Sequence, residues 1–159
     1  MEPAFVTIPY TRVLPHPVEE AYAWLTDYQD DDPQRTTAVV KRRPVLSRTK
    51  DKVVLEGELE MLGVRGVGTV EVTLLPPDRW VAEIVKGGGK GSVYEYRLTP
   101  AAGGGSRLDV RYRVRVRRWS SRLRLLLARP LLRRELDRMW DGFAESMARE
   151  LSRNEAPTR

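Results

Sequence analysis

Three tyrosines stand at alternate positions in two segments with the pattern of β-strands. Tyr94 and Tyr96 belong to one segment, and Tyr112 to the other. A tyrosine hydroxyl needs a hydrogen-bond partner when its ring is buried, and methionines adapt to irregular shapes. Apolar walls with a few convergent polar groups are typical of a small-molecule site. The sequence therefore predicts an apolar ligand cavity. The expected lining residues are Leu55, Leu59, Met61, Val70, Val72, Trp80, Tyr94, Tyr96, Tyr112, Val114, Met139, Phe143 and Met147.

The alternative for these residues is a solidly packed core, because most inward-facing aromatic residues belong to a core. Ionisable groups inside a cavity would favour an enzyme over a carrier, since acid–base catalysis needs them close to the substrate. Glu83, Glu95 and Arg97 are the first to inspect, because the alternation of their strands is the least clear. The sequence identifies no catalytic residue.

Several kinds of chemistry are excluded by composition. The chain has no cysteine and one histidine, His16, so disulfides, cysteine-based zinc sites and thiol catalysis are excluded. His16 lies between two prolines and is expected to be a solvated turn residue. The carboxylates of Asp27 and of residues 30–32 lack the spacing of an EF-hand and are expected to end a helix. We expect no metal ion and no cofactor.

The glycine-rich stretch from Gly87 to Ser92 contains a lysine, as phosphate-binding loops do. It does not match the pattern GxxxxGK[ST], and a strand rather than a helix is expected after it. This stretch is therefore expected to be a flexible hairpin loop, which could act as a gate at the mouth of the cavity.

The chain is basic, with a net charge of +6. Arginines alternate along the segment Arg111–Arg118 and continue into the next segment, where Leu123, Leu125, Leu126 and Leu127 accompany them. A solvated sheet face is the simplest interpretation. An anionic membrane surface is a possible partner, and nucleic acid is a less favoured one. No signal peptide or membrane-spanning run is recognisable, so a cytoplasmic location is expected.

The elements that would position the cavity residues follow from periodicity. Leu108, Val110 and Val114 alternate with charged residues, as in a strand with one buried face. Short connections between such segments predict an antiparallel meander. The expected elements are a strand at Phe5–Val13, a helix at Val18–Thr26, and strands near Thr37–Ser47, Lys52–Leu62, Val64–Leu75, Arg79–Lys86, Ser92–Thr99 and Arg107–Arg117.

The C-terminal segment has helical periodicity. Ser120 or Ser121 could cap its start, and Pro130 must kink the helix or split it in two. An apolar stripe recurs at spacings of three and four residues: Leu132, Leu136, Met139, Phe143, Met147 and Leu151. We expect a single domain over residues 1–154 and a disordered tail over residues 155–159.

This order of elements resembles the helix-grip superfamily of START-like lipid-transfer domains and polyketide cyclases and dehydratases. The resemblance rests on the segment TRVLPHPVEEAYAWLTD (Thr11–Asp27), on YEYRLTP (Tyr94–Pro100), and on the terminal helix with Pro130. It implies an α+β fold, in which about seven antiparallel strands curve around a long C-terminal helix, with one or two short helices after the first strand.

The resemblance implies a cavity but does not name its contents. The first hypothesis is binding or transport of a small hydrophobic ligand such as a lipid, a quinone or a polyketide. The second is a polyketide cyclase or dehydratase in which Tyr94, Tyr96 and Tyr112 orient the substrate. The third is an RNA-binding or membrane-surface module, whose binding would fall steeply with salt. The choice between carrier and enzyme stays open, as does the oligomeric state.

Overall fold

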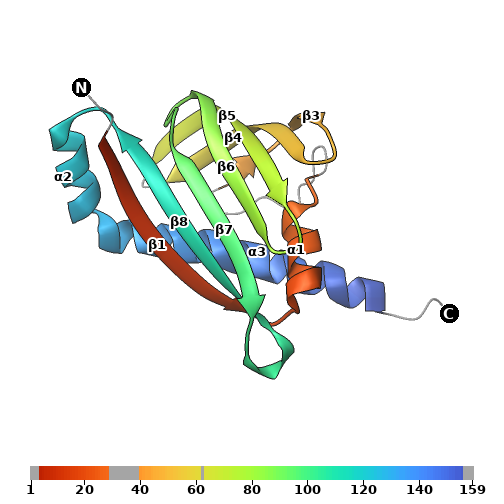
Figure 1. Ribbon diagram of the computed structural model, residues 1–159. Coiled ribbons are helices and arrows are strands. Elements are labelled where there is room, and N and C mark those ends of the chain that lie inside the picture. The colour runs from red at the N-terminus through yellow and green to blue at the C-terminus, as the bar shows by residue number, and fades with distance from the viewer. Residues whose placement is uncertain (1–3, 29–39, 62, 156–159) are drawn as a thin grey trace.

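The structure is a computed structural model that describes residues 4–28, 40–61 and 63–155 (Figure 1). The side chain of Met61 is not part of that description. The strands are β1 (Ala4–Leu14), β2 (Val40–Arg42), β3 (Val45–Arg48), β4 (Lys52–Met61), β5 (Val64–Leu75), β6 (Arg79–Gly87), β7 (Val93–Pro100) and β8 (Ser106–Val116). The helices are α1 (Val18–Thr26), α2 (Trp119–Leu127) and α3 (Arg129–Glu155), with a 3₁₀ turn at Ala102–Gly104.

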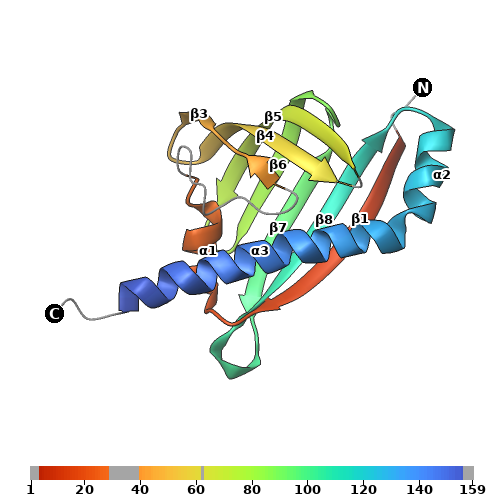
Figure 2. The same cartoon turned by 180° about the vertical axis from the view of Figure 1, so that it is seen from behind.

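The strands form one antiparallel sheet in the order β1-β8-β7-β6-β5-β4-β2, and β3 also pairs with β4. Strands β4 to β8 follow one another as a meander, and β1 joins the far edge beside β8. The sheet curves around α3, which crosses its concave side (Figure 2). The expected α+β helix-grip fold is thus confirmed.

Alternation of residue types explains why the sheet buries one face. In β8, Leu108, Val110 and Tyr112 are buried, while Arg107 and Arg111, which alternate with them, are exposed. Apolar residues in a period of two place one continuous apolar face against the helix. Pro9 occurs in β1, an edge strand, where the missing N–H costs the sheet least.

The prediction of one strand over Thr37–Ser47 is wrong for the part of this segment that the structure describes. Its described part forms two short strands, β2 and β3, separated by Arg43 and Pro44. The pairing with β4 shifts register in both. Pro44 cannot donate to a ladder, and its carbonyl accepts a hydrogen bond from the N–H of Glu56 (3.0 Å). The seven strands along the main order agree with the expected number of about seven, and β3 beside β4 is the eighth described strand.

The C-terminal segment splits in two, as Pro130 predicted. α2 ends at Leu127 and α3 begins at Arg129, so Pro130 lies in the first turn of α3, where its missing N–H is tolerated. The expected serine cap is wrong, because Arg118 holds the N-cap position of α2. α3 continues to Glu155, one residue into the expected tail; residues 156–159 lie outside the described part.

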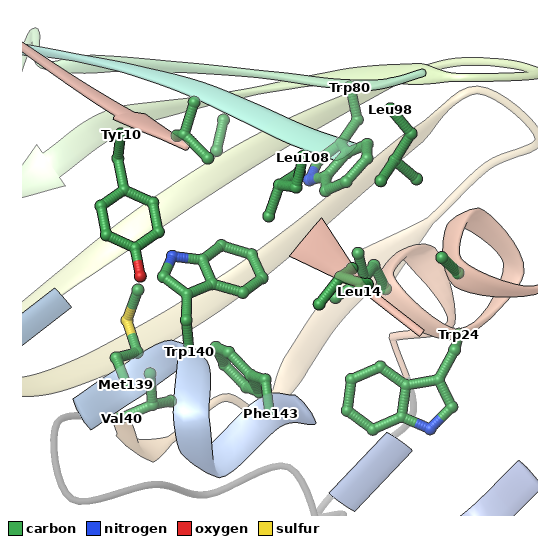
Figure 3. Packing of buried hydrophobic residues seen from close by; sticks show 14 of the residues in the cluster. Tyr10, Leu14, Trp24, Val40, Trp80, Leu98, Leu108, Met139, Trp140 and Phe143 are labelled. Atoms are coloured by element: carbon green, nitrogen blue, oxygen red, sulfur yellow. The ribbon is translucent and has the colours of Figure 1, made fainter. Parts of the chain in front are cut away.

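The core lies between the concave face of the sheet, α1 and α3. Figure 3 shows Trp140 and Phe143 of α3 facing Leu108 of β8 and Trp80 of β6. Leu14, Leu98 and Leu108 are almost completely buried (relative exposure 1%, 1% and 0%). These residues fix α3 against one end of the sheet. No helix in the described segments is long and apolar enough to cross a membrane.

Candidate ligand-binding cavity

A cavity of about 580 Å³ lies between the concave face of the sheet and α3. Its walls come from strands β4 to β8, from Trp24 and Leu25 of α1, and from the buried stripe of α3. Cavities of a few hundred Å³ with mainly apolar walls are typical of small-molecule sites. The space is therefore large enough for a ligand of drug size.

Eleven of the thirteen side chains expected to line the cavity do line it. They are Leu55, Leu59, Val70, Val72, Trp80, Tyr94, Tyr96, Tyr112, Val114, Met139 and Phe143. Met147 is not among the lining residues: its side chain is completely buried in the cluster beside the cavity. The side chain of Met61 lies outside the described part.

Glycines leave part of the β4–β5 wall of the cavity without side chains. Gly57 of β4 and Gly68 of β5 pair directly across the two strands, and both line the cavity, as does Gly66. A Cβ atom at Gly57 would make only ordinary contacts, the nearest with Val70 Cγ2 at 3.5 Å. The β4–β5 wall therefore contributes volume that larger residues would fill.

Aromatic rings form another part of the lining. The rings of Trp80 and Tyr96 are stacked, with centroids 4.8 Å apart and an interplanar angle of 2°. Tyr112 meets the edges of Tyr94 (5.1 Å) and Tyr96 (6.3 Å), and Trp140 packs edge-on against Tyr96 (6.3 Å). Such contacts hold flat, rigid surfaces in fixed orientations. The cavity thus presents a preformed aromatic wall.

The tyrosine hydroxyls of this wall are available to a ligand. The indole Nε1–H of Trp140 donates to the Tyr112 hydroxyl (3.0 Å), which leaves the Tyr112 proton for another acceptor. Among the described residues, no hydrogen bond involves the hydroxyls of Tyr94 or Tyr96. Burial raises the pKa of Tyr94, Tyr96 and Tyr112 above that of a free tyrosine. All three are therefore neutral hydrogen-bond donors at physiological pH.

Arg43 brings a positive charge to the cavity. Its guanidinium carbon lies 5.2 Å from the ring centroid of Tyr28 and 5.5 Å from that of Phe143. It is close enough to Tyr96 to oppose part of the rise in that tyrosine's pKa. Arg43 is the only charged side chain among the described lining residues. The cavity can therefore attract an oxygen that carries full or partial negative charge.

The three ionisable residues proposed for inspection do not enter the cavity. Glu83 and Arg97 are exposed, and Glu95 forms an ion pair with Arg111, its cross-strand neighbour, at 3.5 Å. His16 is also outside the lining. It is half-buried rather than solvated, with Nδ1 3.9 Å from a carboxylate oxygen of Glu20, four residues along the chain in α1.

Sequence reasoning missed five polar or aromatic lining residues: Trp24, Tyr28, Arg43, Ser92 and Trp140. Trp140 follows Leu136 by four residues, a spacing that could have placed it on the buried face of α3. Nothing in the local pattern marks Arg43, since its direction depends on the break between β2 and β3. Ser92 is buried and its hydroxyl accepts the N–H of Arg115 (3.0 Å).

The glycine-rich loop contributes to the same lining through Gly88 and Gly89, which follow β6 directly. Val64 and Val67 of β5 also line the cavity, yet both are largely exposed (71% and 50%). Leu125 of α2 completes this edge. The cavity therefore opens to solvent between the start of β5 and α2. No metal-binding group of carboxylates and histidine occurs among the described residues.

Comparisons with known proteins agree with this architecture. A family model described as polyketide cyclase / dehydrase and lipid transport matches residues 6–148. No curated protein sequence is similar enough to count as a relative.

Solved structures share the fold at low sequence identity. TTHA0849 from Thermus thermophilus is 17% identical, with a TM-score of 0.75, over 91% of this chain and 99% of its own. The Zhui aromatase/cyclase from Streptomyces sp. R1128 is 12% identical (TM-score 0.67; 96% and 97% covered). A START superfamily protein from Mycobacterium smegmatis is 15% identical (TM-score 0.68; 92% and 99% covered).

Proposed function

Because the chain belongs to the polyketide cyclase / dehydrase and lipid transport family, we propose that it binds a small hydrophobic molecule in the cavity. The observation that carries the proposal is the combination of about 580 Å³ of mostly apolar space with tyrosine hydroxyls and one guanidinium. The ligand expected for such walls is flat and largely apolar, with an oxygen acceptor directed at the tyrosines and Arg43.

The contacts define how such a ligand would be held. Its apolar body would lie against Trp80, Trp140 and the glycine wall, and burial of that body would supply most of the affinity. Its oxygen would accept hydrogen bonds from Tyr94 or Tyr96, whose hydroxyls otherwise have no partner among the described residues. A ligand that covers these hydroxyls without offering an acceptor would leave them as buried donors without a partner, which is costly, so a ligand with an acceptor gains more than a plain hydrocarbon.

The first experiment is native mass spectrometry of the purified protein, followed by organic extraction and identification of any co-purified molecule. A hydrophobic fluorescent dye then measures affinity in the emptied protein. Gly57→Leu should lower dye affinity about tenfold or more, since the new side chain occupies the cavity. Glu56→Leu, which places the same side chain on the outer face of the same strand, should leave it unchanged.

Equal dye affinity in the wild type and in Gly57→Leu would contradict binding inside the cavity. Arg43→Met tests the polar end of the site. It should weaken an anionic dye about tenfold and a neutral dye little, because a charged hydrogen bond is roughly twice as strong as a neutral one. Arg97→Met, an exposed arginine of β7, is the matched control.

A second candidate function is a cyclase that uses the same cavity. It is favoured by Arg43 and the neutral tyrosines, because a cation and preorganised donors can stabilise an enolate oxygen. The structurally similar Zhui protein is described as an aromatase/cyclase. However, proton abstraction needs a base, and no carboxylate or histidine occurs among the described lining residues. Binding is therefore the better-supported proposal.

The two candidates predict different results with a poly-β-ketone thioester. A cyclase converts it into a cyclic product with release of water, detected by mass, and Arg43→Met lowers that rate far more than it lowers affinity. A binding protein retains the thioester unchanged, and its open-chain mass is recovered after denaturation.

A further inference from the structure

Helix α2 turns an apolar ridge toward solvent. Trp119, Leu123 and Leu127 are spaced four residues apart, so they lie on one face, and their relative exposures are 73%, 49% and 73%. No residue of α2 is buried. Leu131, at the start of α3, is also half exposed (52%). Contiguous exposed apolar residues of this size mark an interaction site.

Arginines are concentrated in the part of the chain that contains this ridge. Residues 110–134 contain ten arginines and no acidic residue, whereas the rest of the chain has 18 basic and 22 acidic residues and a net charge of −4. Arg122 lies against Trp119, with its guanidinium carbon 5.5 Å from the ring centroid. No ion pair joins Arg118, Arg122 or Arg124 to a carboxylate in the described segments. Their charge is therefore free to meet an external anion.

The ridge lies beside the mouth of the cavity. Leu125, on the inner side of α2, lines the cavity together with Val64 and Val67, which are exposed at the β4–β5 hairpin. Both ribbon views place α2 and the start of β5 at the same end of the molecule (Figures 1 and 2). A binding partner that covers the ridge would thus also face the mouth of the cavity.

We propose that α2, together with Leu131, docks onto an anionic lipid bilayer, so that the cavity mouth opens toward the membrane. The apolar ridge enters the boundary between headgroups and acyl chains, and the arginines contact lipid phosphates. This is the arrangement expected of an interfacial amphipathic helix. Docking itself needs no ligand; the passage of a hydrophobic molecule between bilayer and cavity rests on the proposed function.

A bilayer fits this surface better than other anionic or apolar partners. Nucleic acid would satisfy the arginines but would leave Leu123, Leu127 and Leu131 without an apolar partner. A second copy of the chain would cover the leucines, but a two-fold contact would bring the same arginines of both copies together. Only a bilayer, with anionic headgroups at its surface and an apolar interior below them, complements both the arginines and the exposed leucines.

The test measures binding to vesicles of equal parts phosphatidylcholine and phosphatidylglycerol, with pure phosphatidylcholine vesicles alongside. We expect sedimentation with the anionic vesicles and a blue shift of tryptophan emission. Trp119 is responsible for that shift, because Trp24, Trp80 and Trp140 are already buried. The double variant Arg122→Gln/Arg124→Gln should lose about 25-fold in partitioning, or about fivefold for each arginine near an anionic surface.

The variant Trp119→Ser/Leu123→Ser should lose about tenfold or more and abolish the blue shift, while its fold stays intact because both positions are exposed. The matched control Arg97→Gln/Arg107→Gln removes the same charge from exposed positions of β7 and β8 and should partition as the wild type does.

Three results would overturn docking: equal binding to neutral and anionic vesicles, unchanged binding in Arg122→Gln/Arg124→Gln, or a dimer or an RNA complex that forms through the ridge without any vesicle binding. The cavity dye, measured without vesicles, separates the two proposals. Dye binding without vesicle binding would contradict membrane docking but not the proposed function. Vesicle binding without dye binding would contradict the proposed function but not membrane docking.

Discussion

Buried tyrosines are the residues whose chemistry the fold changes most. The pKa of Tyr10 is raised to about 12 by burial and by its hydrogen bond to Asp137, and burial raises those of Tyr94, Tyr96 and Tyr112 as well. In each case the native state favours the neutral phenol. The cavity therefore contains donors rather than bases throughout the physiological range.

The raised pKa values of these tyrosines make the free energy of unfolding depend on pH in the alkaline range. A raised native pKa means that the tyrosines stabilise the fold fully below the unfolded value near 10 and lose that contribution as pH rises through the native values. We expect the free energy of unfolding, from urea titrations, to fall steadily above pH 10. Tyr112→Phe should make the fall shallower. A pH-independent free energy up to pH 12 would contradict the assignment.

The identity of these residues was largely predictable, whereas the cavity's charge was not. Tyr94, Tyr96 and Tyr112 stand in clear period-two strands, so their direction follows from the sequence. Arg43 points inward because β2 and β3 are separate strands with shifted registers. Such a break depends on long-range pairing with β4, which local patterns do not contain.

At the level of elements, glycines allow β5 and β6 to approach each other. A Cβ atom at Gly68 would lie 2.9 Å from the carbonyl oxygen of Lys86 and 3.3 Å from Ile84 Cγ2. The pairing of these strands shifts register next to it, between Thr69 and Val70. Bulges of this kind bend a strand, and the bend contributes to the curvature that creates the cavity.

Gly68→Ala should therefore lower the free energy of unfolding by about 1–3 kcal/mol, the range for added atoms in a packed region. Gly66→Ala is the matched control in the same strand, since no atom lies within 4 Å of its Cβ position. It should be neutral or stabilise by up to about 1 kcal/mol. Equal urea midpoints for the two variants would contradict this prediction, because they would show that β6 can move away from an added Cβ atom at Gly68.

Elements were predicted well where the pattern was long and uninterrupted. The helix at Val18–Thr26 and the strand near Arg107–Arg117 were confirmed within one or two residues. Pro130 correctly marked a break. The start of α2 was misplaced because serines are preferred caps, yet the chain leaves β8 already at Val116 and turns at Arg118.

At the scale of the whole molecule, two surfaces of opposite character lie next to each other: the wall of an internal apolar cavity, and an external arginine-rich helix beside the mouth of that cavity. Burial of apolar area is not screened by ions, whereas attraction to phosphates is, with a Debye length of about 10 Å at 0.1 M salt. The two proposed activities should therefore respond differently to ionic strength.

We expect dye affinity to change less than about twofold between roughly 0.05 and 0.5 M sodium chloride, while binding to anionic vesicles falls about tenfold or more. Fluorescence titration and vesicle sedimentation in the same buffers provide the comparison. Loss of dye affinity in salt would indicate that the dye binds the arginine surface rather than the cavity.

The pairing of β1 with β8 has a consequence for how the protein is made. β1 (Ala4–Leu14) leaves the ribosome well before its partner, which spans Ser106–Val116. At roughly 5–20 residues per second, β1 waits on the order of 5–20 s for that partner, and α3 emerges later still. Most of the nascent chain, with its apolar strand faces uncovered, must stay unaggregated for that time, so chaperone demand during synthesis follows directly from the topology.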